Sequence, residues 1–348
     1  YDLLVLPPSF PFGGMENPRL SFMTPTIIAG DKSLVGTVAH ELAHSWSGNL
    51  VTNATWSDAW LNEGVTSYVE NRVMETVFGK DRAVMEQSLA LDDLKSEIAA
   101  LERPELSRLQ LPSDIDHPDD AFSGVAYVKG EFFLHFLEQR YGRENFDAFL
   151  KSWFDSHAFR AATTEDFREF LMRELAAKHP DAASVAEINE WIDGEGLPQT
   201  LVAPVSAAFD KVEEQQAQWM SGLAPATTIK ATGRTTQEWL HFITALPDDL
   251  SLARMADLDQ AFDFTHSANA EIAFAWYMRA VKRKYEPAMP AIEAFLGRVG
   301  RGKFLYPLYE ELAKDGDRAF AERTFEKSRA LYHPIAQRRV GELLQAQN

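Results

Sequence analysis

The segment Val38-Ala39-His40-Glu41-Leu42-Ala43-His44 contains an H-E-x-x-H motif, which constrains the local fold more than any other part of the sequence. On an α-helix, residues four positions apart differ by only about 40° in direction and by about one turn in height. His40 and His44 therefore lie side by side if the segment is helical, and their imidazoles can bind one metal ion. Glu41 then lies next to that ion, where it can take a proton from a water molecule. The motif predicts a helix that carries a zinc site.

A third ligand is expected from the segment Trp60-Leu61-Asn62-Glu63-Gly64. Glu63 follows His44 by 19 residues, which leaves room for the first helix to end, for a loop, and for a second helix to begin. The sequence contains no cysteine, so a transition metal has to be held by imidazoles and carboxylates. We therefore predict that His40, His44 and Glu63 bind one zinc ion per chain.

The composition argues against several classes of protein. The 348 residues carry 34 basic and 52 acidic side chains, and the formal net charge of −18 argues against nucleic acid and anionic membranes as partners. A hydrophobic fraction of 45% is ample for large cores and argues against disorder. No apolar run approaches the roughly 18 residues that a membrane-spanning helix needs. We expect a monomer and, as its location, the cytoplasm.

Length and pattern predict two domains. The first covers residues 1–194, with a buried strand expected at 3–6 and helices at about 34–47, 58–78, 81–103, 124–141, 143–156 and 163–178. A glycine- and proline-containing linker follows over residues 195–205. Residues 206–348 contain eight short helical segments joined by brief loops, which is typical of a helical-pair superhelix or bundle. The predicted fold class is mainly α, with a small β-sheet near the N-terminus.

Glu16 has two interpretations. It follows a pair of glycines at positions 13 and 14, and glycine pairs most often mark a turn before an ordinary edge strand. Near a zinc site, the same glycines let another backbone approach closely, and an edge strand can pair with an extended peptide. In that case Glu16 places a carboxylate beside the peptide.

Two interpretations, one structural and one functional, also apply to Glu70, to Tyr127 and to a basic loop. Glu70 lies on the helix face of Glu63 and is either a hydrogen-bond partner of a ligand histidine or a solvated carboxylate. Tyr127 either packs in the core, as most tyrosines do in part, or faces the metal. The loop Arg298-Val299-Gly300-Arg301-Gly302-Lys303 is either a solvated surface or a clamp for an anion or carboxylate.

Taken together, the motifs resemble the gluzincin zinc aminopeptidases, and within them the branch of leukotriene hydrolase and aminopeptidase B. The motifs are Gly13-Gly14-Met15-Glu16-Asn17, His40-Glu41-Leu42-Ala43-His44, Trp60-Leu61-Asn62-Glu63-Gly64 and Tyr127-Val128-Lys129-Gly130. The resemblance covers essentially the whole chain. It implies a thermolysin-like zinc-peptidase domain followed by a helical-repeat domain. It also implies that the first domain is N-terminally incomplete, because the family carries an N-terminal β-rich domain that is not found in these residues.

The resemblance implies catalytic roles for matched residues. Zinc is bound by His40, His44 and Glu63, and Glu41 is the general base. Tyr127 stabilises the oxyanion of the tetrahedral intermediate.

The resemblance also implies how a substrate is held. Glu16 binds the α-ammonium group, and Arg301 with Lys303 binds the carboxylate of a short peptide. The implied substrate-binding residues are Gly13, Gly14, Met15, Glu16, Asn17, Asp119, Phe122, Arg301 and Lys303. Phe122 departs from the pattern, since leukotriene hydrolase carries a second pocket tyrosine there.

These observations predict a zinc metallo-aminopeptidase that removes N-terminal residues from short peptides. Three alternatives stay open: a zinc endopeptidase with an open cleft, a leukotriene-type epoxide hydrolase that Phe122 disfavours, and a non-catalytic peptide-binding scaffold. The scaffold is disfavoured because a catalytic domain that had lost its activity would have no reason to keep Glu41, Glu63 and Tyr127 together.

Overall fold

The computed structural model describes residues 1–115, 121–314 and 317–346. Two compact units divide the chain, and each is described by itself. One unit consists of Tyr1–Thr37 together with Ala207–Asn348, and the other of Val38–Ser206. The predicted domain boundaries at residues 194 and 206 stay a prediction.

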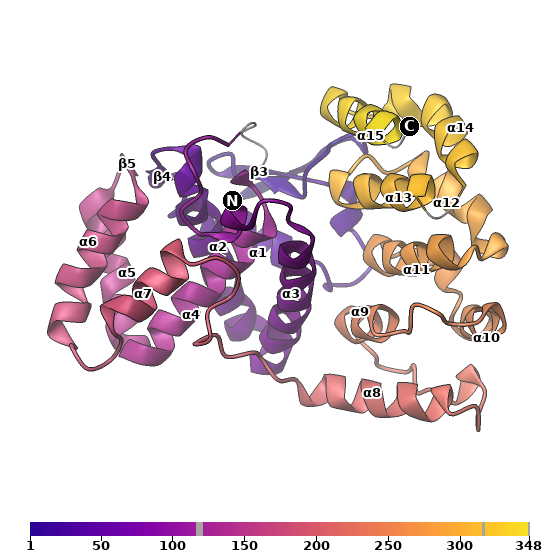
Figure 1. The fold of residues 1–348 in the computed structure, drawn as a ribbon, viewed down its shortest axis with the longest axis horizontal. Coiled ribbons are helices and arrows are strands. Elements are labelled where there is room, and N and C mark those ends of the chain that lie inside the picture. Colours follow the sequence, from indigo (N-terminus) through magenta and orange to yellow (C-terminus); the bar gives the residue numbers. More distant parts are fainter. Residues whose placement is uncertain (116–120, 315–316, 347–348) are drawn as a thin grey trace. The chain divides into compact units, whose positions relative to one another are not determined.

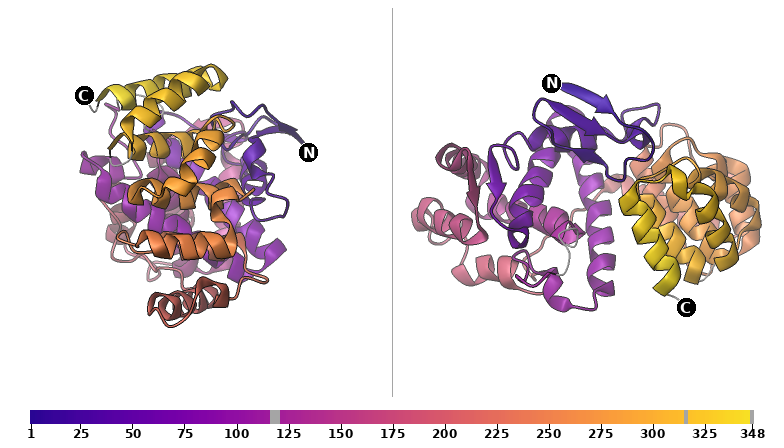
Figure 2. Two further views of the ribbon diagram at one scale, coloured as in Figure 1. Left: turned by 90° about the vertical axis from the view of Figure 1, so that its right-hand side faces the viewer. Right: turned by 90° about the horizontal axis from the view of Figure 1, so that it is seen from above.

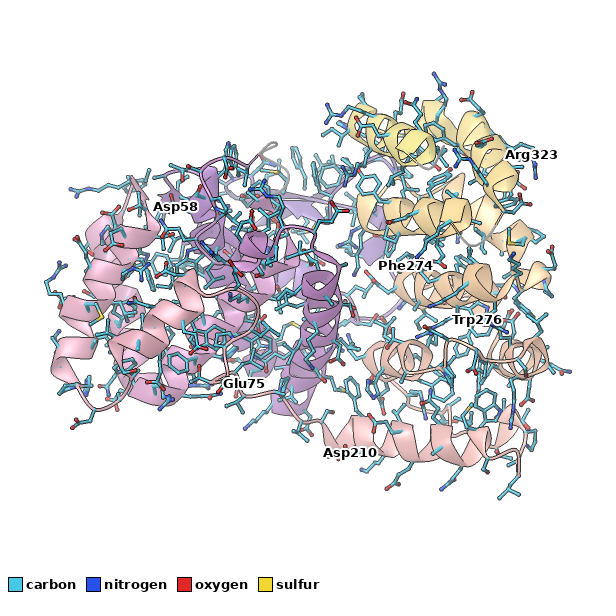
Figure 3. The ribbon with its side chains drawn as sticks, in the orientation of Figure 1. Asp58, Glu75, Asp210, Phe274, Trp276 and Arg323 are labelled. Atoms are coloured by element: carbon cyan, nitrogen blue, oxygen red, sulfur yellow. The ribbon has the colours of Figure 1, made fainter. Side chains whose placement is uncertain are left out.

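The central element of the unit Val38–Ser206 is helix α2, Ala59–Phe78. Its first ten residues are all buried, so this helix is covered on every side rather than on a single apolar face. Helix α4 lies beside it (Figure 1). Asp58 and Glu75, labelled in Figure 3, lie at the two ends of α2. The other elements of this unit are α1 (Gly36–Ala43), β4 (Val51–Asn53), η2 (Trp56–Asp58), α3 (Lys80–Ala100), η3 (Pro104–Ser107), the π-helix η5 (Val125–Lys129), α4 (Gly130–Tyr141), α5 (Arg143–His157), β5 (Arg160–Ala162), α6 (Thr164–Glu174), η6 (Ala176–Lys178) and α7 (Val185–Asp193).

The second unit begins with a three-stranded sheet. Strands β1 (Asp2–Val5), β3 (Leu20–Met23) and β2 (Gly14–Met15) lie side by side in that order. Figure 2 shows these strands as indigo arrows near the N-terminus. β1 pairs with β3 in parallel and β2 pairs with β3 antiparallel, with Gly14 opposite Met23. The short helix η1 (Pro25–Ile27) follows.

Residues 207–346 of this unit fold into stacked short helices (Figure 1). Their caps agree with the sequence: Thr235 and Glu238 form a capping box, and Asn269 caps the next long helix. Trp276, labelled in Figure 3, is buried and donates a hydrogen bond to Thr265. The elements are α8 (Ala207–Met220), η7 (Ala226–Thr228), α9 (Thr236–Thr244), α10 (Leu252–Phe262), η8 (Phe264–His266), α11 (Ala270–Arg283), η9 (Glu286–Ala288), α12 (Met289–Leu296), α13 (Gly302–Lys314), α14 (Arg318–Ser328), η10 (Arg329–Leu331) and α15 (Pro334–Ala346).

Most predicted helices are confirmed, and the differences have physical reasons. A strand exists at Asp2–Val5, but the predicted burial is wrong: its residues are exposed because no described element covers either face of β1. Helix α7 and the short β4–β5 pair were not predicted. Ser184 and Glu187 form a capping box at the start of α7, so the sequence did contain a signal for that helix. Within the described residues, no helix combines the length and the apolar character needed to cross a membrane.

Candidate active site

The H-E-x-x-H motif lies on helix α1 and the turn that follows it. The N–H of His44 donates to the carbonyl of His40, so the helical spacing continues to the second histidine. The two imidazole centroids are 4.7 Å apart. The predicted juxtaposition of His40 and His44 is therefore confirmed, although the helix begins at Gly36 rather than directly after Ser33.

Glu63 completes a compact group of three ligand atoms. Its Oε2 lies 3.2 Å from Nε2 of His40 and 3.4 Å from Nε2 of His44. All three ligand atoms lie within 4.8 Å of one another. Zinc–ligand bonds of about 2.0–2.1 Å at tetrahedral angles separate neighbouring ligands by about 3.4 Å. The measured separations therefore fit a tetrahedral zinc ion.

The second nitrogen of each histidine is occupied, which leaves Nε2 for the metal. Nδ1 of His40 lies 2.9 Å from Oε2 of Glu70, and Nδ1 of His44 lies 2.9 Å from the carbonyl of Ser47. Thr66 Oγ1 also lies 3.1 Å from Nδ1 of His44. Such partners fix the tautomer and the orientation of a ligand ring. Of the two interpretations of Glu70, the structure shows the hydrogen bond to a ligand histidine. Ser47 and Thr66 were not predicted, because no spacing rule points to them.

The charges of the site suit a cation. Burial lowers the pKa of His40, but the hydrogen bonds to Glu63 and Glu70 outweigh burial and hold this pKa well above its usual value of 6.5. Burial raises the pKa of Glu63, but hydrogen bonds from His40 and His44 outweigh it and lower this pKa to about 2. The carboxylates of Glu63 and Glu70 thus stabilise a positive charge in the site, carried either by a proton on His40 or by a divalent cation. Metal binding is favoured once His40 has lost its proton.

Glu41 and Tyr127 belong to the same unit. Glu41 is buried and follows His40 directly on α1. The Tyr127 ring stacks on the His40 imidazole, with centroids 5.8 Å apart and an interplanar angle of 18°. Tyr127 lies in the π-helix η5 rather than in the α-helix that the sequence predicted. Single π-turns within α-helices occur frequently at functional sites.

Two glycines bring these elements together. A Cβ atom on Gly64 would lie 2.7 Å from Cα of Gly130 and 2.8 Å from the carbonyl oxygen of Ala126. The backbone of α2 therefore touches the backbone of η5 and α4 directly. Gly64 follows Glu63 and Gly130 comes three residues after Tyr127, so this contact places the third ligand and the tyrosine at one site.

The predicted substrate loops lie together in the other unit. The N–H of Gly300 donates to Pro8 and the N–H of Gly302 to Pro11, each at 2.8 Å. A Cβ on Gly13 would lie 2.7 Å from Nη2 of Arg301. The glycine loop and the basic loop are thus one connected structure. Gly14, Met15, Glu16, Asn17 and Lys303 belong to this unit as well.

Glu271 belongs to this cluster and was not predicted. Its two carboxylate oxygens lie 3.4 Å from Nη1 of Arg301 and 2.8 Å from Nζ of Lys303. Burial raises the pKa of Glu271, but the charges of Lys303 and Arg301 outweigh burial and lower it. Glu271 lies in the first turn of α11, where a glutamate is common, and its partners are 30 and 32 residues away in the sequence. The sequence therefore gives no signal of this pairing.

Three predicted substrate residues have distinct surroundings. Phe122 is 38% exposed and packs edge-on against Trp56, with centroids 5.7 Å apart. Nδ2 of Asn17 is buried and has no hydrogen-bond partner within the described residues. Asp119 lies outside the described residues.

The fold and the metal-binding geometry define a metallopeptidase. The family model for the peptidase family M1 domain matches residues 1–191, more than half of the chain. The chain belongs to peptidase family M1. Membership of this family implies zinc as the metal. The model for the C-terminal part of leukotriene A4 hydrolase matches residues 234–344, which confirms the predicted branch and the helical C-terminal domain.

Individual relatives agree with this assignment. The chain is 37% identical to leucine aminopeptidase 2 of Neurospora crassa over 98% of this chain and 52% of that protein. It is also 37% identical to leucine aminopeptidase 2 of Pyricularia oryzae, over 96% of this chain and 56% of that protein. A solved structure of yeast LTA4 hydrolase in complex with bestatin superimposes with a TM-score of 0.91 at 32% identity, covering 99% of this chain and 59% of the yeast chain. The chain therefore spans between half and three fifths of the length of these relatives.

Replacement of Gly64 by alanine tests the backbone contact. The added methyl group collides with backbone atoms of Gly130 and Ala126, which cannot swing away as a side chain can. We expect Gly64→Ala to lower the free energy of unfolding by about 1–3 kcal/mol and to weaken zinc binding. Calorimetric unfolding measures the first effect. Gly341→Ala is the control, because no atom of the described residues lies within 4 Å of a Cβ there and a helical alanine stabilises by up to about 1 kcal/mol. Equal effects of the two changes would contradict the contact.

Replacement of Glu70 by alanine tests the orientation of His40. Loss of the hydrogen bond to Nδ1 should raise the Kd for zinc by about 10- to 100-fold. Competition with a chromophoric chelator measures this Kd. Glu75→Ala on the same helix removes an ion pair with Arg143, the one that the described residues give Glu75, and should leave the Kd unchanged. A Glu70→Ala protein with wild-type zinc affinity would show that His40 needs no such partner.

Proposed function

We propose that the protein is a zinc aminopeptidase that removes residues from the free N-terminus of short peptides. The observation that carries the proposal is the group formed by His40, His44 and Glu63, with Glu41 adjacent and the Tyr127 ring stacked on His40. Membership of peptidase family M1 supports it independently. One zinc ion per chain follows from the single set of three ligands that we assign. The predictions of a monomer and of a cytoplasmic location stay predictions.

The residues of the chain divide the chemistry among them. Bound zinc supplies Lewis acidity, which polarises a carbonyl group and acidifies water. Glu41 accepts the proton of the attacking water and later delivers it to the leaving amine. The hydroxyl group of Tyr127 donates a hydrogen bond to the oxygen on which negative charge develops, so it stabilises the transition state more than the substrate.

The substrate roles follow from charge. A fixed carboxylate at Glu16 favours a free ammonium group and disfavours residues upstream of it, which limits cleavage to the N-terminus. Arg301 and Lys303 are suited to the carboxylate of a short peptide. Gly13 and Gly14 leave the backbone open to close approach.

Hydrolysis of a leukotriene-type epoxide is the second candidate, since the yeast structure with the same fold is that of an LTA4 hydrolase. Phe122 disfavours it, because phenylalanine has no hydroxyl group to offer to a carbocation or an epoxide oxygen. Peptide hydrolysis is therefore the better-supported reaction.

Replacement of Glu41 by glutamine separates metal binding from turnover. Glutamine keeps the size of the side chain and cannot accept the proton, so kcat should fall by at least about 100-fold. The zinc content should stay at the wild-type value. Steady-state kinetics and elemental analysis of the same sample measure the two effects. A Glu41→Gln protein that keeps more than a tenth of the wild-type rate would remove Glu41 from the role of base.

Acetylation of the substrate tests the assignment of an aminopeptidase. Because relatives are named leucine aminopeptidase 2, a leucyl peptide is a suitable probe. A free leucyl tripeptide should be cleaved and its N-acetylated form should not, since acetylation removes the charge that Glu16 is proposed to bind. Chromatography of the products measures both. Equal cleavage of the two peptides would indicate an endopeptidase, and zinc binding without cleavage of either would favour a peptide-binding scaffold.

A further inference from the structure

We propose that Lys129 and Glu97 are positioning residues that hold the π-helix η5 at its two ends and thereby fix Tyr127. The inference rests on the proposed function, because it concerns the group that stabilises the transition state. Its basis is that the buried ammonium group of Lys129 and the half-buried carboxylate of Glu97 both form hydrogen bonds with backbone atoms at the ends of helical segments.

Lys129 carries a charge into the core without a carboxylate partner. Its side chain is fully buried, and its Nζ donates to the carbonyls of Ser107 at 2.7 Å and Gly194 at 2.8 Å. Within the described residues, no carboxylate is hydrogen-bonded to this ammonium group. Burying an ammonium group is costly unless its hydrogen bonds are made. An apolar side chain would fill the same space without the free-energy cost of burying a charge, so filling space does not account for the lysine.

The two carbonyls explain how the charge is tolerated. Ser107 is the last residue of η3, and Gly194 is the C-cap of α7. The carbonyl ends of helices carry partial negative charge, and a cation is stabilised there. Burial lowers the pKa of Lys129 to about 8, the nearby cation of Arg108 adds to the decrease, and Glu190 opposes it. Lys129 thus ties the end of η5 to the ends of two other helical segments.

Glu97 holds the opposite end of the same helix. Both of its carboxylate oxygens lie 3.1 Å from the N–H of Gly124, the N-cap of η5. A Cβ on Gly124 would lie 2.3 Å from Oε2 of Glu97, so the carboxylate occupies the space that a side chain would need. Burial raises the pKa of Glu97, and the Gly124 N–H opposes this effect. The carboxylate therefore binds a donor that the helix itself leaves unpaired.

Anchors at both ends matter because a π-helix is strained relative to an α-helix. Val125–Lys129 is a single wide turn with an extra residue, and relaxation to α-helical geometry shifts the register by one residue. Such a shift rotates a side chain by about 100° around the helix axis. Tyr127 lies in the middle of the turn, stacked on His40, and cannot keep that position if the turn relaxes.

The first experiment replaces Lys129 by methionine in the purified protein. Methionine keeps the length of the side chain and removes the ammonium group. We expect kcat for a leucyl substrate to fall by about 10- to 100-fold, the effect of misplacing a reacting group by about 1 Å, with KM within about twofold and unchanged zinc content. Lys178→Met is the matched control, because the Lys178 side chain is 61% exposed and, in the described part of the chain, forms its ion pair with Glu174 on the surface. Its kcat should equal that of the wild type.

A double-mutant cycle tests whether the effect passes through Tyr127. Lys129→Met should lower kcat strongly in the wild type and by less than about twofold in the Tyr127→Phe background, because the hydroxyl group to be positioned is already absent. The same factor in both backgrounds would overturn the proposal. So would wild-type kcat in the Lys129→Met protein.

A second variant keeps the test decisive if Lys129→Met does not fold. Glu97→Ala removes the other anchor, and the same dependence on Tyr127 is expected. Failure of the proposed function has a different signature, since the zinc-loaded wild-type protein itself would then leave the leucyl substrate intact. An active wild type with additive effects of Glu97 and Tyr127 would refute only the positioning role.

Discussion

The direct backbone contact between Gly64 and Gly130 is the constraint on which the candidate site depends. Neither residue has room for a methyl group, so α2 approaches η5 and α4 more closely than ordinary helices do. Glu63 and Tyr127 are each within three residues of the contact, so the contact brings the segments that carry them together. The two motifs that contain Gly64 and Gly130 lie where α2 crosses η5 and α4. This close crossing requires a glycine directly after the third ligand, Glu63.

A second feature of the site is that several of its buried or half-buried charges have specific partners. His40 lies between two carboxylates, Glu97 binds a helix N-terminus, and Lys129 binds two helix carbonyl ends. Even a paired buried charge loses its hydration, so this part of the core is less stable than an apolar one would be, while its geometry is fixed by the pairing. A bound zinc ion returns part of that cost, because a site that exists only in the folded chain couples metal binding to folding. The acidic composition has no comparable consequence, since most of its charge is on the surface.

The sequence predicted what local spacing determines. The pair His40 and His44 needs only the helical repeat, and Glu63 needs only a loop of plausible length, so both could be found without a structure. The π-turn around Tyr127, the pairing of Glu271 with Arg301 and the β4–β5 pair depend on contacts between distant segments. No periodicity encodes these contacts. Helix α7 is different, because the capping box of Ser184 and Glu187 is a local signal in the sequence, close to the glycine- and proline-containing linker.

In the unit that contains the N-terminal sheet, the loop around Gly13 and the loop around Arg301 are in direct contact. The guanidinium group of Arg301 fills the space in which a side chain at position 13 would lie, and two backbone hydrogen bonds join the segments around them. Under the proposed function, the loop that recognises the amine and the cation that recognises the carboxylate form one rigid piece. Glu271 is buried and pairs with both Arg301 and Lys303, so it offsets one of their two positive charges. The cluster keeps one net positive charge, which can attract a substrate carboxylate without displacement of Glu271. Selectivity for short peptides then depends on geometry as well as on charge, because only a peptide of the right length reaches both loops at once.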